Sequence, residues 1–386
     1  MTTSNRVVQL TTVHHPYDPR IYHKECKSLQ KAGFEVFLLA KEDKNSERKE
    51  EPIKHIKLKS YTSRLKRMTI GALAAYKQAK KLNADVYHFH DPELLPIGWL
   101  LKNKNNHVIY DIHEDYITSI MQKDYVSRPI RKLIAFTYKT MERFFSKNME
   151  LCLAEKYYQD IYPTGKCILN YPTINQKFSE HKRTGTSENK LLYTGNVTLD
   201  RGALIHAKIP VIDERMEVYY VGKCPSTLAE QIYNKAATKK DNIQIEGIDQ
   251  FVEKEDIEER YLQYNWLAGI ALFPPTEHYM KKELTKFFEY MNAGIPVICS
   301  NFPVWENFIN KHQCGITVDP YNDQEIKDAI SYLVENPDKA QEMGANGKKA
   351  VQHELNWEVE ENKLITWYSD LIRFNQGERD GDSNGI

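Results

Sequence analysis

Leu284-Thr-Lys-Phe-Phe-Glu-Tyr-Met-Asn-Ala-Gly-Ile-Pro-Val-Ile298 joins a helix to a buried strand. Apolar side chains recur at helical spacing up to residue 292, Gly294 ends the helix, and an apolar run follows over 295–299. Lys286 and Glu289 share one helical face, because they lie three residues apart. The amides of a helix start attract phosphate, and the carboxylate can accept hydrogen bonds from ribose hydroxyls. The stretch therefore predicts either a nucleoside diphosphate site or an ordinary αβ unit with a solvated Lys–Glu pair.

Strands and helices alternate on both sides of this stretch. Candidate strands occupy 6–13, 34–40, 85–90, 107–112 and 150–154, and then 190–194, 217–221, 243–245, 268–273 and 295–299. Repeated βα units predict parallel, doubly wound sheets. A length of 386 residues suits two domains rather than one core. The predicted fold class is α/β, with two Rossmann-like doubly wound domains facing each other across a cleft.

Composition along the chain suggests where these domains begin and end. We expect an N-terminal domain over 1–174, a polar linker over 175–189 and a second domain over 190–357. Residues 358–375 have the apolar spacing of a final helix. The polar residues 376–386 are rich in Gly and Asp and are expected to form a disordered tail.

Polar loops follow three candidate strands of the first domain, at the sheet edge where ligands of such folds bind. The residues that form a possible cleft there are His15, Arg20, His90, Asp91, His113 and Glu114. Arg20 and His15 have the charge and hydrogen-bonding groups to contact a phosphate. The alternative is that Asp18 and Arg20 only brace their loop. A histidine at a strand end is likewise often a structural residue.

The second domain begins with a further glycine-containing loop, Tyr193-Thr-Gly-Asn-Val-Thr-Leu-Asp-Arg-Gly202. Gly195 allows close backbone approach next to Asn196, and Arg201 precedes the small residue Gly202. A guanidinium can pair with phosphate oxygens at two points. Gly222 marks the end of the next strand. The loop matches neither a Walker A motif nor a GxGxxG motif.

These segments resemble the family 4 retaining glycosyltransferases of the GT-B fold, of the bacterial group 1 type. Their C-terminal motif, Pro-x-Lys-x-x-Glu-Tyr-Met-x-x-Gly-x-Pro-Val, is similar to residues 284–297. The resemblance implies that Glu289 holds the ribose of a sugar nucleotide and that His113, Arg201 and Lys286 act in catalysis. It also implies donor contacts from Leu284, Thr285, Gly195, Asn196, Gly202 and Gly222. The chain differs from the family in having Lys281 where many members have a first glutamate, and in lacking a Gly-Gly pair in its first loop.

The resemblance implies transfer of a sugar from a nucleotide-diphosphate sugar to an acceptor hydroxyl, with retention of anomeric configuration. UDP is the favoured nucleotide and GDP the second choice, and no metal or other cofactor is expected. The expected pathway is bacterial cell-surface polysaccharide or glycolipid synthesis, and helix 358–375 is expected to cross back onto the first domain. Two alternatives remain: a sugar-nucleotide 2-epimerase of the same fold, and a non-catalytic nucleotide-binding subunit.

Charge is balanced overall but unevenly distributed. Residues 54–82 hold nine Lys or Arg and no acidic residue, and 128–147 alternates cations with large apolar residues. This pattern predicts peripheral contact with an anionic membrane that carries a lipid-linked acceptor. The alternative is a core-packed helix with a solvated basic face. No nucleic-acid-binding module accompanies the charge.

The chain also carries no apolar run of the roughly 18–20 residues that a membrane span needs. Its six cysteines lack metal-ligand spacing, which is typical of reduced thiols in a cytoplasmic protein. We therefore expect a cytoplasmic protein, with a further expectation of location at the inner face of the plasma membrane.

Overall fold

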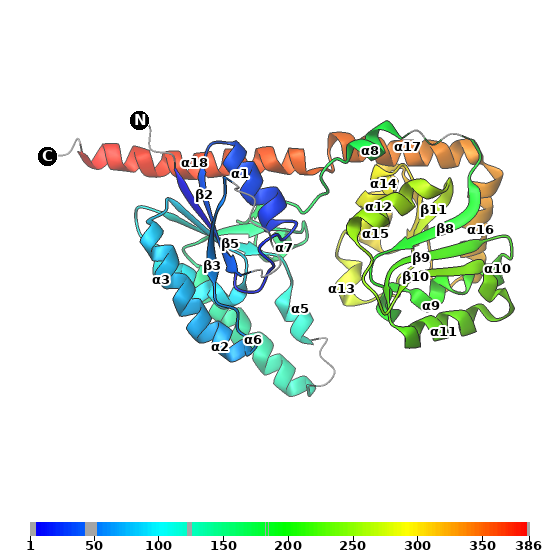
Figure 1. The fold of residues 1–386 in the computed structure, drawn as a ribbon, viewed down its shortest axis with the longest axis horizontal. Helices are drawn as coiled ribbons and strands as arrows, with labels where there is room; N and C mark the ends of the chain where they lie inside the picture. The colour runs from blue at the N-terminus through cyan, green and yellow to red at the C-terminus, as the bar shows by residue number, and fades with distance from the viewer. Residues whose placement is uncertain (1–4, 43–51, 122–125, 182, 184, 384–386) are drawn as a thin grey trace. The chain divides into compact units, whose positions relative to one another are not determined.

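A computed structural model describes residues 5–42, 52–121, 126–181, 183 and 185–383 (Figure 1). The chain forms two compact units: Met1–Asn170 together with Trp357–Ile386, and Tyr171–Asn356. The division at Asn170 differs from the expected linker at 175–189, which lies inside the second unit. There Asn175 caps helix α8 (Gln176–Glu180), and Phe178 is buried. A capped helix with a buried aromatic residue packs like part of a domain, although its polar composition resembles that of a linker.

The first unit contains a parallel sheet with the order β3-β2-β1-β4-β5-β6-β7. Its central strands are almost entirely buried, as expected for a parallel sheet covered on both faces. The sequence pattern did not predict the edge strands β3 and β7, because they are short or polar. The strands are β1 (Arg6–Leu10), β2 (Glu35–Lys41), β3 (Lys54–Leu58), β4 (Val86–Phe89), β5 (His107–Ile112), β6 (Glu150–Leu153) and β7 (Lys166–Cys167).

Helices cover both faces of this sheet, and each face has its own hydrophobic core. One core packs the sheet against α3 and α4, and the other packs it against α1 and α18. The helices of the unit are η1 (Ile21–Cys26), a π-helical stretch that continues as α1 (Lys27–Lys31), then α2 (Arg64–Lys66), η2 (Arg67–Gly71), α3 (Ala72–Leu82), η3 (Pro92–Leu94), α4 (Leu95–Leu101), α5 (Tyr116–Met121), α6 (Arg128–Ser146), α7 (Tyr158–Ile161) and α18 (Trp357–Ser383).

Helix α18 belongs to the first unit although it comes last in the chain. The indole nitrogen of Trp357 donates to Ser28 Oγ at 3.0 Å, and the hydroxyl of Tyr368 lies 2.7 Å from His88 Nδ1. The helix continues to Ser383, so residues 376–383 are helical where a disordered tail was expected. Adding a residue to an existing helix costs far less than starting one, which is why polar composition did not end it. Residues 384–386 lie outside the described part of the chain.

The second unit contains a parallel sheet with the order β10-β9-β8-β11-β12-β13. The strands are β8 (Glu188–Thr194), β9 (Glu217–Cys224), β10 (Ile243–Ile248), β11 (Trp266–Ala271), β12 (Val297–Ser300) and β13 (Gly315–Val318). The remaining helices are η4 (Leu199–Arg201), α9 (Ala203–His206), α10 (Ile209–Ile212), α11 (Ser226–Ala236), η5 (Ala237–Asn242), α12 (Lys254–Gln263), α13 (Glu277–Met280), α14 (Thr285–Asn292), α15 (Pro303–His312), α16 (Asp323–Glu335) and α17 (Pro337–His353). The prediction of two doubly wound, parallel-sheet α/β domains is confirmed.

Two further observations concern membrane crossing and thiols. Among the described helices, none combines the length and the apolar character that crossing a bilayer requires. All six cysteines are free thiols, and five of them are buried.

Candidate functional site

The loop after β8 and helix α14 meet at the carboxyl edge of the second sheet. Gly195 follows β8 with a φ of 85°, a left-handed conformation that favours glycine. A Cβ atom at this position would lie 2.9 Å from the Nζ of Lys286 on α14. The backbone of Gly222 in β9 approaches Gly195 so closely that a side chain at 222 would overlap its carbonyl group. Three glycine- or lysine-containing segments far apart in sequence therefore converge here.

Lys286 is a buried cation, with 8% of its surface exposed. Its Nζ lies 5.0 Å from the ring centroid of Tyr193, and no carboxylate forms a salt bridge with it among the described residues. Burial lowers the pKa of Lys286 to about 8; Glu289 partly opposes this shift and Arg201 adds to it. A buried ammonium without an ion-pair partner suits an anionic ligand, because a bound phosphate would supply the missing charge.

Glu289 lies one turn further along α14 and is half-buried. Its Oε2 accepts a hydrogen bond of 2.9 Å from the hydroxyl of Tyr261, which also lies 2.9 Å from Thr194 Oγ1. No donor to Oε1 exists among the residues that the structure describes. The carboxylate is thus oriented through one oxygen, and the other can accept a hydrogen bond from a ligand hydroxyl.

Arg201 ends the short turn η4, next to Gly202. Its Nε donates to the hydroxyl of Tyr279 at 3.1 Å, and that hydroxyl donates to Asp200 Oδ2 at 3.0 Å. The guanidinium is half-buried and interacts electrostatically with Lys286. Tyr279 therefore fixes a second cation on the same side of the sheet as Lys286.

The other predicted donor residues lie around these groups. Leu284 is the N-cap of α14 and is partly buried, Thr285 is exposed at the first helical position, and Asn196 is exposed beside Gly195. The backbone carbonyl of Asn196 accepts a hydrogen bond of 2.8 Å from Tyr193. The sequence pattern did not indicate the tyrosines at 193, 261 and 279. Tyr193 follows an apolar run, which has the signature of the core, and Tyr261 and Tyr279 lie in polar stretches far along the chain from the residues they contact.

In the first unit, two of the predicted cleft residues brace the interior. Arg20 is 3% exposed, and its Nε lies 3.0 Å from Glu25 Oε1 and 3.1 Å from Asp111 Oδ2. Asp91 is 1% exposed and accepts hydrogen bonds from the backbone nitrogen and hydroxyl of Thr12. Arg20 therefore points into the unit and does not present its charge to a phosphate at the surface. In this position the guanidinium lies between two carboxylates and donates two hydrogen bonds to Asp111.

His113 lies where the polar loop after β5 leaves the sheet, with its side chain 15% exposed. Its Nε2 is 2.8 Å from Asp111 Oδ2 and 3.0 Å from the Nδ1 of His90, which is buried. His15 and Glu114 are exposed. The sequence pattern did not indicate Asp111 or Glu25 as functional residues, since each lies inside an element whose pattern indicates packing.

Four of these buried groups, Glu25, His88, His90 and Asp111, place possible ligand atoms within 4.8 Å of one another. The donor types would suit a divalent cation. The guanidinium of Arg20 already lies among the carboxylates, however, and a metal would have to share the space with a fixed positive charge. Burial raises the pKa of Glu25 well above its ordinary value, whereas Arg20 and His113 outweigh burial and hold the pKa of Asp111 well below its own. One arginine and one ionised carboxylate thus balance each other's charge in this cluster.

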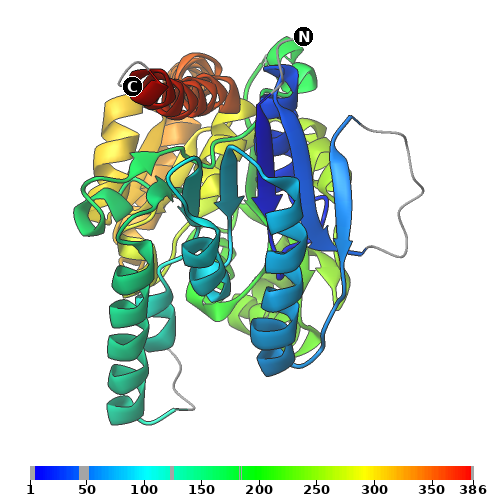
Figure 2. The same cartoon turned by 90° about the vertical axis from the view of Figure 1, so that its left-hand side faces the viewer.

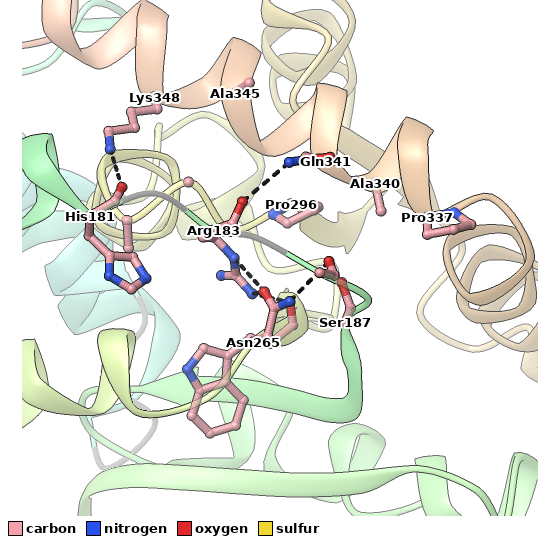
Figure 3. A pocket seen from close by; sticks show the side chains of 14 residues that line it. His181, Arg183, Ser187, Asn265, Pro296, Pro337, Ala340, Gln341, Ala345 and Lys348 are labelled. Carbon is pink, nitrogen blue, oxygen red and sulfur yellow. Dashed lines mark hydrogen bonds between the residues drawn. The ribbon is translucent and has the colours of Figure 1, made fainter.

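A cavity of about 300 Å³ lies elsewhere in the second unit (Figure 3). Its wall includes Ser187, Asn265 and Pro296, which stand at the amino ends of strands, so it opens at the edge opposite Lys286. The guanidinium of Arg183 donates to Asn265 Oδ1 at 2.9 Å, and Lys348 donates to the carbonyl of His181 at 2.7 Å. These bonds tie the segment before β8 to β11 and α17, which is a structural role.

Comparisons with known proteins agree with this architecture. A family model for group 1 glycosyl transferases matches residues 237–350, and one for glycosyltransferase family 4 matches residues 19–154. Comparison with curated protein sequences finds no match.

Solved structures resemble the chain over almost its whole length. Sucrose-phosphate synthase from Thermosynechococcus elongatus has a TM-score of 0.72 and 16% identity, over 96% of this chain and 99% of that one. A glycosyltransferase from Rickettsia africae has a TM-score of 0.70 and 15% identity, over 96% and 99%. HepE from Anabaena, in complex with UDP, has a TM-score of 0.68 and 11% identity, over 95% and 100%. At these identities the likeness shows the fold.

Proposed function

The chain belongs to the group 1, family 4 glycosyltransferases of the GT-B fold, and we propose that it moves a sugar from a nucleoside-diphosphate sugar to an acceptor hydroxyl. The observation that carries this proposal is the buried ammonium of Lys286 beside Gly195 and Glu289. A diphosphate would neutralise the ammonium, and the glycine backbone would allow it to approach closely. Oε1 of the glutamate would accept a hydrogen bond from a ribose hydroxyl. Few small ligands other than a nucleoside diphosphate combine these groups.

The proposed reaction retains the anomeric configuration and uses a UDP-sugar, with a GDP-sugar as the second choice. HepE, a protein of the same fold, binds UDP, which supports the uridine nucleotide here. Arg201 and Lys286 would stabilise the negative charge that builds on the departing diphosphate, so the protein itself supplies the cations and no metal is required. The proposed role lies in bacterial cell-surface polysaccharide or glycolipid synthesis.

A thermal-shift panel of UDP, GDP, ADP and TDP and their sugar nucleotides tests the nucleotide site. A ligand at about 100 times its Kd should add about 2.7 kcal/mol to the stability of the native protein. We expect one selective nucleotide, whose effect is lost in Glu289→Ala and kept in Glu246→Ala. Glu246 is a matched control, since it also accepts bonds from a neighbouring side chain, that of Arg260, but lies on β10.

Product analysis then separates the alternatives. Transfer of sugar to an acceptor supports the proposed function, and a changed configuration at the sugar C2 without transfer indicates a 2-epimerase. Selective nucleotide binding with neither product indicates a non-catalytic subunit. No response to any nucleotide would contradict the nucleotide site itself.

Helix α6 favours a second function, peripheral contact with an anionic membrane. Both views show this helix extending beyond the sheet of the first unit (Figures 1 and 2). Only Ala135 and Glu142 of α6 are buried among its described residues. The helix exposes six large apolar side chains, those of Ile130, Leu133, Ile134, Phe136, Met141 and Phe144. A helix packed into a core would hide these groups, so their exposure argues against the core-packed alternative.

Cations accompany the exposed apolar side chains. Helix α6 carries Arg131, Lys132, Lys139 and Arg143. Elsewhere in the same unit, the stretch α2–η2–α3 exposes Leu65, Met68, Ile70 and Leu73 next to further basic residues. Large apolar groups flanked by Lys and Arg are typical of helices that lie in the interface of anionic lipid. We propose that the protein is cytoplasmic and that the exposed face of α6 holds it at the inner face of the plasma membrane, where a lipid-linked acceptor would be found.

Co-sedimentation with phosphatidylglycerol vesicles and with phosphatidylcholine vesicles tests this contact. We expect salt-sensitive binding to the anionic vesicles only, and loss of that binding in a Leu133→Ser, Phe136→Ser double variant. Phe251→Ser is the control, since Phe251 is equally exposed but lies in the second unit. Equal behaviour of the double variant and the control would contradict the proposal.

A further inference from the structure

The cavity beside α17 in the second unit has basic residues but no acidic ones in its described wall (Figure 3). The basic residues are His181, Arg183 and Lys348, and no described residue of the wall is an Asp or Glu. Glu188, which lies close to this wall in the sequence, forms a salt bridge with Lys190 instead. The wall therefore has a net positive charge.

One nitrogen of the Arg183 guanidinium is buried and has no acceptor. Nε and Nη2 donate to Asn265 Oδ1 at 3.1 and 2.9 Å, and Nη2 also donates to the carbonyl of Trp266 at 2.5 Å. Nη1 is buried as well, but it has no hydrogen-bond partner among the residues that the structure describes. A guanidinium nitrogen can only donate, and a buried donor without an acceptor is costly. Nη1 therefore suits an acceptor that a ligand would supply.

Lys348 brings a second cation to the same part of the cavity. A Cβ atom at Gly294 would lie 3.6 Å from Cδ of Arg183 and 3.9 Å from Cδ of Lys348, so the two side chains pass the same point. Nζ of Lys348 donates one of its three hydrogens to the carbonyl of His181 at 2.7 Å. Burial lowers the pKa of Arg183 to about 10 and also lowers the pKa of Lys348, and no described carboxylate counteracts either shift. A bound anion would supply the missing counter-charge for both cations.

Apolar side chains form much of the remaining wall. Helix α17 contributes Pro337, Ala340 and Ala345, the end of α14 contributes Ala293, and Pro296 precedes β12. The cavity of about 300 Å³ is also larger than the ~150 Å³ that holds a benzene molecule in an apolar protein interior. It therefore has room for a small apolar body together with an anionic group.

We infer that this cavity binds a small organic anion, whose carboxylate or phosphate group contacts Arg183 and Lys348 and whose apolar body packs against α17. The site is separate from the candidate nucleotide site, because neither Lys286 nor Glu289 belongs to its wall. The inference is therefore independent of the proposed function. The bonds of Arg183 to β11 are kept, since the ligand uses only Nη1 of the guanidinium.

Saturation-transfer NMR of the full chain tests the site with three probes: 3-phenylpropanoate, phenyl phosphate and the neutral analogue 3-phenylpropanamide. We expect saturable binding of at least one anion and no binding of the neutral probe, and the anion that binds more tightly identifies the head group. Saturating UDP should leave the anion bound. Absence of binding by both anions, equal binding of the neutral probe, or displacement of the anion by UDP would overturn the inference.

Two adjacent lysines of α17 provide a variant and its matched control. Lys348→Gln keeps a donor for the carbonyl of His181 but removes the charge, so the Kd of the anion should rise at least about tenfold, the effect of one lost charge-assisted hydrogen bond. Lys349→Gln removes the same charge from an exposed position outside the wall and should leave this Kd unchanged. Equal Kd values for the two variants would refute the role of Lys348.

A variant that fills the cavity tests its place in the fold. Ala345 is an exposed residue of the wall, and its methyl side chain makes no hydrogen bond, so Ala345→Leu narrows the cavity without removing a polar contact. We expect this variant to lose anion binding and Lys349→Leu, on the same helix, to keep it. Full anion binding by a folded Ala345→Leu protein would place the anion elsewhere and overturn the inference.

Discussion

Nucleotide binding by the second unit should weaken as the pH rises through about 8, the value to which burial lowers the pKa of Lys286. Only the ammonium form carries the charge that would hold a diphosphate. Its population falls from about nine-tenths at about pH 7 to about one-tenth at about pH 9, so the Kd for UDP should rise about tenfold, or about 1.4 kcal/mol. Binding near the pKa should also take up about half a proton per nucleotide.

Isothermal titration calorimetry over this pH range, in buffers of different ionisation enthalpy, measures both quantities. Lys286→Arg is the matched control, because a guanidinium remains charged at every pH used. The Kd of this variant for UDP should not change with pH, apart from any effect of ionisation of the nucleotide itself, which would be the same for the wild-type protein. Parallel curves for the two proteins, or binding without proton uptake in the wild type, would refute the assignment of the diphosphate to Lys286.

The stability of the unliganded protein should respond to pH in the opposite direction. Lys286 has a lower pKa in the folded state than its ordinary value of 10.5, so the unfolded chain binds more protons between about pH 8 and 10.5. The contribution of this group to the free energy of unfolding therefore rises with pH over that window. Opposite slopes for stability and for binding would be difficult to attribute to general alkaline damage.

Three further predictions concern stability and orientation. Gly202→Ala should destabilise the second unit by about 2–4 kcal/mol in urea unfolding, because φ is 76° and the new methyl group would overlap a backbone carbonyl. The control is Gly185→Ala, which should cost only about 1 kcal/mol, since φ is 84° there but the space around it is open. Equal losses of stability in the two variants would show that the overlap at 202 is relieved. Tyr261→Phe should weaken UDP binding about fivefold by releasing Glu289, and an unchanged Kd in titration would mean that this bond does not orient the carboxylate. Glu142→Leu should destabilise the first unit by about 3 kcal/mol, because three buried or half-buried tyrosine hydroxyls lose their hydrogen-bond acceptor. Amide hydrogen exchange in α6 at the wild-type rate would contradict this prediction.

Local spacing was sufficient to predict the two sheets and to place Lys286 and Glu289 together on one helix. Alternating strands and helices are short-range patterns, and Lys286 and Glu289 lie on one turn of one helix, so their shared face follows from helix geometry alone. The glycines at 195 and 202 are visible in the same way, because a tight turn requires them wherever the rest of the chain lies. The edge strands escaped prediction, since a polar or two-residue strand has no distinctive periodicity.

Tertiary structure alone decided which polar residues are buried and which apolar ones are exposed. The pairing of Arg20 with Asp111 joins residues 91 positions apart, and Tyr368 reaches His88 across 280 positions. No local pattern encodes such contacts. The same reason applies to α6: its sequence shows that one face is apolar, but only the packing of the neighbouring elements determines that this face remains uncovered. Spacing within the chain thus determined the elements, and contacts between distant elements determined what each side chain can do.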